Sequence, residues 1–127
     1  MKYFALLFAI VLISCIPDST KKQINDQMVE VQKMVADQQF TRTIAFVELH
    51  KVRYGAYPES LKDLTFLSQM DSMMSNMQYH KLDSGYELNI KGVFQNISGD
   101  QLPITLKYPP EFWKGLGCIR SNTREQE

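Results

Sequence analysis

The sequence predicts an α+β fold, in which a long N-terminal helix packs on a small antiparallel sheet. No glycine or proline interrupts residues 21–54, and residues 86–90 alternate between apolar and polar as a half-buried strand does. Helix and strands therefore occupy separate parts of the chain, which is typical of the α+β class. Within the predicted helix, the first apolar residues follow the 4-3-4 spacing of one helical face: Ile24, Met28, Val31 and Val35.

The predicted helix changes its apolar face partway along. A polar patch at residues 37–39 separates the first apolar set from a second one, which contains Phe40, Ile44 and Val47. Either one long helix presents two surfaces, or two helices meet near this patch. The second apolar set is the larger face, so we expect it to cover the sheet.

Turn residues divide the rest of the chain into short elements. Gly55 can end the helix in a left-handed conformation, and Pro58 prevents the helix from resuming. We expect a short helix over residues 58–64 and a helical turn in the methionine-rich residues 68–78. Two to four antiparallel strands follow, with candidates at 86–90, 93–97 and 103–108.

Composition and charge argue against several classes of function. The 127 residues predict one small domain, and equal numbers of acidic and basic residues give no formal net charge. Nucleic acid is not expected as a partner, because no basic excess is available to neutralise phosphates. The cysteines and histidines match no zinc motif, and no phosphate loop or nucleophile elbow is present. We therefore expect no enzyme activity, no metal and no cofactor.

The N-terminus has the order of elements found in a secretory signal peptide. Lys2 precedes the apolar residues 3–13, which are too few to span a membrane as a helix. A small residue and a cysteine follow, in a pattern that resembles the lipobox of bacterial lipoproteins: Leu12-Ile13-Ser14-Cys15. This resemblance implies that the chain is cut before Cys15 and that the Cys15 thiol is lipidated. An ordinary signal peptide with a chance cysteine, or a buried N-terminal strand, is the alternative.

The lipobox resemblance also divides the chain and gives its location. The expected parts are a signal peptide (1–14), a lipidated cysteine and tether (15–22), one α+β domain (23–118) and a flexible tail (119–127). The lipid bilayer of the bacterial cell envelope is then the first partner. The outer membrane is favoured, because Ile16 is not the aspartate that retains lipoproteins in the inner membrane.

Residues 44–64 carry a second resemblance. The stretch from Gly55 through Tyr57 and Pro58, followed by Ser60-Leu61-Lys62-Asp63-Leu64, is similar to the junction after the long helix of type IV pilin-like proteins. The resemblance applies especially to the pseudopilins of type II secretion. The resemblance implies a pilin-head-like fold in which Gly55, Tyr57 and Pro58 form a structural turn. A lipobox stands where the prepilin signal of that family would be, so polymerisation is not implied.

Two features remain as candidate sites for partners or chemistry. Five aromatic residues could line a partner or ligand surface: Tyr79, Tyr86, Tyr108, Phe112 and Trp113. With Cys15 lipidated, Cys118 has no partner in its own chain. It is then either a small buried thiol or a thiol that is reactive or paired with another chain.

These observations predict a lipoprotein that acts by contacts with envelope proteins, in association with a secretion or pilus-like assembly. The alternative is a small ligand-binding or inhibitor lipoprotein of the periplasm, which would use a groove between the aromatic residues.

Overall fold

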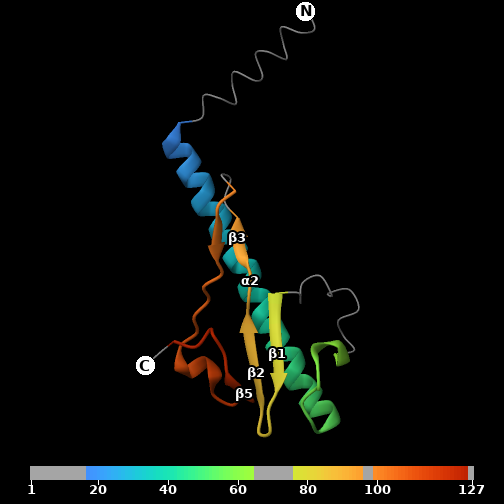
Figure 1. Cartoon of the computed structure of the whole chain (residues 1–127). Helices are drawn as coiled ribbons and strands as arrows, with labels where there is room; N and C mark the ends of the chain where they lie inside the picture. Colours follow the sequence, from blue (N-terminus) through green and yellow to red (C-terminus); the bar gives the residue numbers. More distant parts are fainter. Residues whose placement is uncertain (1–16, 65–75, 96–98, 126–127) are drawn as a thin grey trace, which may run out of the picture.

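The computed structural model describes residues 17–64, 76–95 and 99–125, and it confirms the α+β class. The chain forms a long helix, a three-stranded sheet and a two-stranded sheet, and Figure 1 shows the strands lying along the helix. The elements, in chain order, are α2 (Asp18–Tyr54), the 3-10 turn η1 (Leu61–Asp63), β1 (Met77–Lys81), β2 (Tyr86–Ile90), β3 (Val93–Gln95), β4 (Gln101–Pro103), the 3-10 turn η3 (Pro110–Trp113) and β5 (Cys118–Arg120).

The helix α2 is continuous, so the change of apolar face happens within one helix. It begins at Asp18, inside the stretch predicted as a tether, because Pro17 and Asp18 suit a helix start. Proline is pre-organised at a helix entry, and a carboxylate in the first turn interacts favourably with the helix dipole. The helix ends at Gly55, whose φ of 78° is left-handed and whose N–H donates to the Lys51 carbonyl at 2.9 Å.

The first sheet has the order β1-β2-β5 and is mixed, which corrects the prediction of a purely antiparallel sheet. β1 and β2 form an antiparallel hairpin in which Met77 lies opposite Ile90 and Lys81 opposite Tyr86. β5 pairs with β2 in parallel, with Cys118 opposite Tyr86. The chain returns to the free edge of β2 after a long connection, and such a connection permits the parallel direction that a tight turn does not.

The core lies between the second half of α2 and this sheet. Ala36, Phe40, Thr43, Ile44 and Val47 form the buried face of the helix, as the second apolar set predicts. They are covered by side chains from the sheet and from the segment that leads to β5: Met77, Tyr86, Leu88, Ile90, Leu106, Trp113 and Cys118. Alternate residues of β2 are buried, so the predicted period-2 strand is confirmed.

The second sheet is the antiparallel hairpin β3-β4, which lies beside α2 above the first sheet in Figure 1. β4 ends at Pro103, so most of the strand expected over 103–108 is absent. Tyr108 instead makes an isolated parallel bridge with Arg124. The helical turn expected in residues 68–78 falls largely outside the described residues, and Met77 belongs to β1 rather than to a helix.

The predicted flexible tail is wrong for residues 119–125. Ile119 and Arg120 belong to β5, and the Thr123 side chain is fully buried. The Tyr108 N–H donates to the Thr123 carbonyl at 2.8 Å, and the Glu125 N–H donates to the Tyr108 carbonyl at 3.2 Å. The polar composition of this segment indicated exposure, but backbone pairing of this kind does not depend on apolar side chains.

Within the described part of the chain, no helix is long and apolar enough to cross a membrane.

Candidate functional site

A half-buried carboxylate, Glu48, joins four parts of the domain. Its Oε1 accepts hydrogen bonds from the Tyr86 hydroxyl at 2.9 Å and from the Gly117 N–H at 2.7 Å. The Tyr57 hydroxyl donates to its Oε2 at 3.3 Å. Glu48 therefore links α2 to the turn after the helix, to β2 and to the segment before β5.

The tyrosines around Glu48 are held in their protonated, donating form. Burial and the neighbouring Glu48 carboxylate raise the pKa of Tyr86 well above its usual range. The same causes, burial first, raise the pKa of Tyr57. The rings of these two residues meet edge to face with centroids 5.1 Å apart. This arrangement is a packed, hydrogen-bonded joint between elements.

The turn predicted at Gly55, Tyr57 and Pro58 is fastened to the sheet. Pro58 is fully buried, and its carbonyl accepts a 2.6 Å hydrogen bond from the Tyr79 hydroxyl. Burial, and then the nearby Glu59 carboxylate, raise the pKa of Tyr79. Thus Gly55 ends the helix, while Tyr57 and Pro58 fix the direction in which the chain leaves it.

A second group of aromatic rings packs against α2 from the segment between β4 and β5. Tyr108 stacks on Phe40 and Phe112, with centroids 5.5 and 4.4 Å away, and Trp113 meets Phe112 edge to face. The Tyr108 hydroxyl donates to the Asp37 carboxylate of α2. Burial and this hydrogen bond raise the pKa of Tyr108.

The five aromatic residues predicted as one surface therefore separate into two groups. Tyr79 and Tyr86 belong to the group at Glu48, with centroids 5.7 Å apart. Tyr108, Phe112 and Trp113 belong to the group at Asp37. Tyr86 and Trp113 are buried, at 0% and 5% exposure, so the prediction of one open groove is wrong. These rings were a surface candidate because aromatic density alone does not distinguish a core from an interface.

Cys118 is a buried thiol, which is one of the two alternatives left open by the sequence. Its side chain is 1% exposed, and its Sγ donates to the Arg120 carbonyl at 3.4 Å. Burial raises the pKa of Cys118 to about 11. A protonated, enclosed thiol is a poor nucleophile and is out of reach of another chain.

The described ranges contain no group of three histidine, cysteine, aspartate or glutamate residues placed to hold a metal ion. His50 instead packs at the end of α2, where its Nδ1 lies 2.9 Å from the Ala56 carbonyl. His80 is exposed on β1.

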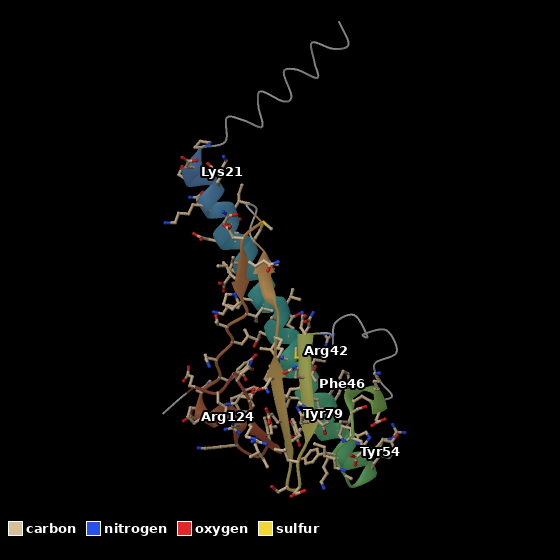
Figure 2. The ribbon with its side chains drawn as sticks, viewed as in Figure 1. Lys21, Arg42, Phe46, Tyr54, Tyr79 and Arg124 are labelled. Carbon is tan, nitrogen blue, oxygen red and sulfur yellow. The ribbon has the colours of Figure 1, made fainter. Side chains whose placement is uncertain are left out.

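A row of exposed apolar side chains lies on the first half of α2. We call it the α2 stripe: Ile24, Met28, Val31 and Val35. Figure 2 shows the labelled Lys21 at this end of the helix, far from Tyr79 and Arg124, which lie in the folded domain formed by the sheets and the second half of α2. The sequence predicts the stripe as a helical face, and the structure leaves it exposed.

A shallow hollow of about 390 Å³ lies between α2 and the segment after β4. Its lining is mixed in charge and includes Lys33, Asp37, Lys107 and Tyr108.

Comparison of the chain with protein-family models, with curated proteins and with solved structures finds no match. The fold class therefore rests on the structure alone.

Sequence reasoning missed Glu48 as the centre of a site. The available signal was its position: it follows Val47 and lies four residues after Ile44, at the border of the buried helix face. A carboxylate at such a border needs a partner from the covering sheet, but the sequence does not show which one.

Proposed function

We propose that this chain is a lipid-anchored lipoprotein of the bacterial cell envelope that acts by contacts with other proteins. The observation that carries this proposal is the α2 stripe. Val31 is 58% exposed and Val35 is 42% exposed, although both are apolar and lie on a regular helix. A run of apolar side chains in water is typical of a surface that a partner covers.

The position of the stripe relative to Cys15 supports a role close to a membrane. Helix α2 begins at Asp18, only three residues after Cys15, and three residues span at most about 11 Å. Ile24 is a further six residues along, or about 9 Å of helix. A lipid on Cys15 would hold the stripe just above the bilayer, where a membrane-bound partner can reach it.

The association with a secretion or pilus-like assembly rests on the resemblance at residues 44–64. Its support is local: Gly55 adopts the left-handed conformation, and Pro58 is buried with its carbonyl bound by the Tyr79 hydroxyl, which suits a structural turn after a long helix. Fold likeness alone does not assign a partner, so the partner is sought directly.

The lipid anchor is tested by processing in a bacterial host. We expect the native chain to fractionate with membranes and to accumulate as an uncut precursor when the lipoprotein signal peptidase is inhibited with globomycin. Cys15→Ala should remain uncut whether or not globomycin is present, because it has no thiol to lipidate, whereas Cys118→Ser should behave like the native chain. Normal cleavage of Cys15→Ala, with globomycin-insensitive membrane binding, contradicts the anchor.

The protein-contact role is tested by chemical crosslinking in membranes followed by affinity capture. Val31→Asp places a charge in the stripe, and Lys33→Asp places the same residue on another face of the same helix. We expect Val31→Asp to lose the crosslinked product and Lys33→Asp to keep it. Both variants should unfold near the native temperature, because both positions are exposed. Equal products from both variants contradict the role of the stripe.

A second candidate function, binding of a small ligand, has one observation in its favour. The hollow beside α2 is large enough for a small polar molecule and carries charges of both signs. A ligand of this class should raise the unfolding temperature of the native chain and not that of Lys33→Ala. If no compound in a small-molecule panel does so, this candidate is discarded.

A further inference from the structure

The side chains of the α2 stripe surround a hollow that has the form of a coiled-coil hole. This hollow, about 370 Å³ in volume, is lined by Ile24, Gln27, Met28 and Val31, together with Gln32. The first four occupy positions i, i+3, i+4 and i+7 of the helix. In helix pairs that pack knobs into holes, these four positions form the hole that receives one side chain of the facing helix. The partner suited to the stripe is therefore another helix.

The residues beside the stripe carry no charge. In the heptad defined by the stripe, the flanking positions are occupied by Asn25, Gln27, Gln32 and Met34. Charges at these positions normally select between partners, and like charges there would prevent two identical helices from pairing. The charged residues of this helix segment, Asp26, Glu30 and Lys33, lie on other faces. A second copy can approach without electrostatic repulsion along the stripe.

Charged residues limit the stripe at both ends. Lys21 lies one heptad before Met28, and Arg42 lies one heptad after Val35, on the same side of the helix. Both are exposed. Two copies would therefore meet in register over Ile24 to Val35 and no further, because a shifted register brings a charged residue against an apolar one.

We propose that the α2 stripe pairs with the α2 stripe of a second copy of this chain, in a parallel dimer. This inference rests on the proposed lipid anchor, since two chains held in one leaflet run in the same direction. Two heptads are too short for strong pairing in solution. Confinement to a membrane plane raises the effective concentration of one helix near the other, so that a weak contact becomes a stable one.

The experiment is disulfide crosslinking of the full-length lipidated chain in native membranes. Val31→Cys places a thiol in the stripe, where it faces its own copy in a parallel in-register pair. Lys33→Cys is the matched control on another face. Both substitutions are made in the otherwise native chain. Its own Cys118 can stay in place, because this thiol is buried and is not available for crosslinking. We expect Val31→Cys to form a product of twice the chain mass under oxidation. We expect Lys33→Cys to form none, because cysteines that point apart cannot be bridged.

Three other results overturn the inference, and they differ in what they say of the proposed function. A Val31→Cys product that contains a different protein overturns the pairing of copies but supports the protein-contact role. Equal dimer from Val31→Cys and Lys33→Cys shows random collision. No product from either variant overturns the pairing, while the processing of Cys15→Ala still reports on the anchor independently.

Discussion

The Tyr86 hydroxyl on β2 lies 2.9 Å from Glu48 Oε1 on α2, and the same oxygen accepts the Gly117 N–H at 2.7 Å. One carboxylate oxygen thus receives a side chain from the middle strand and a backbone group from the segment that leads to β5. The helix, the hairpin and the C-terminal segment are joined at this atom.

Removal of the Glu48 carboxylate should destabilise the whole domain. Glu48→Ala leaves the Tyr86 hydroxyl and the Gly117 N–H without their acceptor, and we expect the free energy of unfolding to fall by about 2–4 kcal/mol. Glu48→Gln keeps one acceptor oxygen and should lose less. Denaturant titration measures both. Glu30→Ala, on an exposed turn of the same helix, should change stability by less than about 0.5 kcal/mol. A loss for Glu48→Ala that is no larger than for Glu30→Ala contradicts the role of Glu48.

A side chain at Gly117 should not be tolerated next to Tyr57. A Cβ atom at this position would lie 1.8 Å from the Tyr57 hydroxyl oxygen and 2.3 Å from the ring carbon that carries it. We expect Gly117→Ala to lower the free energy of unfolding by about 1–3 kcal/mol, the usual range for overpacking. In the Tyr57→Ala background the same change should cost much less, because the clashing ring is gone. If the stability losses of Gly117→Ala and Tyr57→Ala simply add in the double mutant, the predicted clash between the two positions is contradicted.

The Cys118 thiol should resist alkylation in the folded protein. Burial raises its pKa to about 11, so near neutral pH almost no thiolate is present and the sulfur is enclosed. Ile119→Cys in a Cys118→Ser background is the comparison, because Ile119 is 45% exposed on the same strand. We expect iodoacetamide to modify the Ile119→Cys variant quickly and native Cys118 only after unfolding. Rapid modification of native Cys118 without loss of structure would mean that the thiol is accessible.

Stability should fall in alkaline solution. Burial raises the pKa values of Tyr57, Tyr79, Tyr86, Tyr108 and Cys118 in the folded state. As pH rises past the ordinary pKa values, near 9 for the thiol and 10 for the phenols, the unfolded chain loses these protons first. The unfolded state then binds fewer protons than the folded state, so the free energy of unfolding decreases with pH.

We therefore expect full stability from these groups below about pH 9 and progressive loss above it. Denaturant titrations at several alkaline pH values measure the loss, and tyrosinate absorbance should rise together with unfolding. Tyr86→Phe removes one of the groups and should reduce the slope of stability against pH. A slope that is flat up to about pH 11 contradicts the prediction.

The parts of the fold that were predictable are those in which a local pattern and the packing agree. The face of Phe40, Ile44 and Val47 and the alternation of β2 both appear in the sequence, because each element is buried on one side. Gly55 was predictable for a local reason, since it alone among nearby residues adopts a left-handed conformation without strain.

The parts that were not predictable depend on residues distant in the sequence. β1 has no clean alternation, since its later residues are exposed, and it forms by pairing with β2. β5 is three residues long. It pairs with Tyr86 of β2, and the Arg124 guanidinium donates to its Cys118 carbonyl at 2.6 Å. The site at Glu48 was missed for the same reason, because its donors lie in three separate segments.

The continuity of α2 has a consequence for the position of the folded domain, which consists of the sheets and the second half of α2. A helix of 37 residues is about 55 Å long, and its buried face starts only at Ala36. The first side chain that packs against the core is Val29, so with a lipid on Cys15 the first three turns would act as a spacer about 16 Å long between the bilayer and the folded domain. Deleting seven residues before Val29 should lower the folded domain by about 10 Å while turning it by only about 20°. The length of this spacer is therefore a property that can be varied separately from the fold, and it sets the height at which the folded domain meets whatever lies above the membrane.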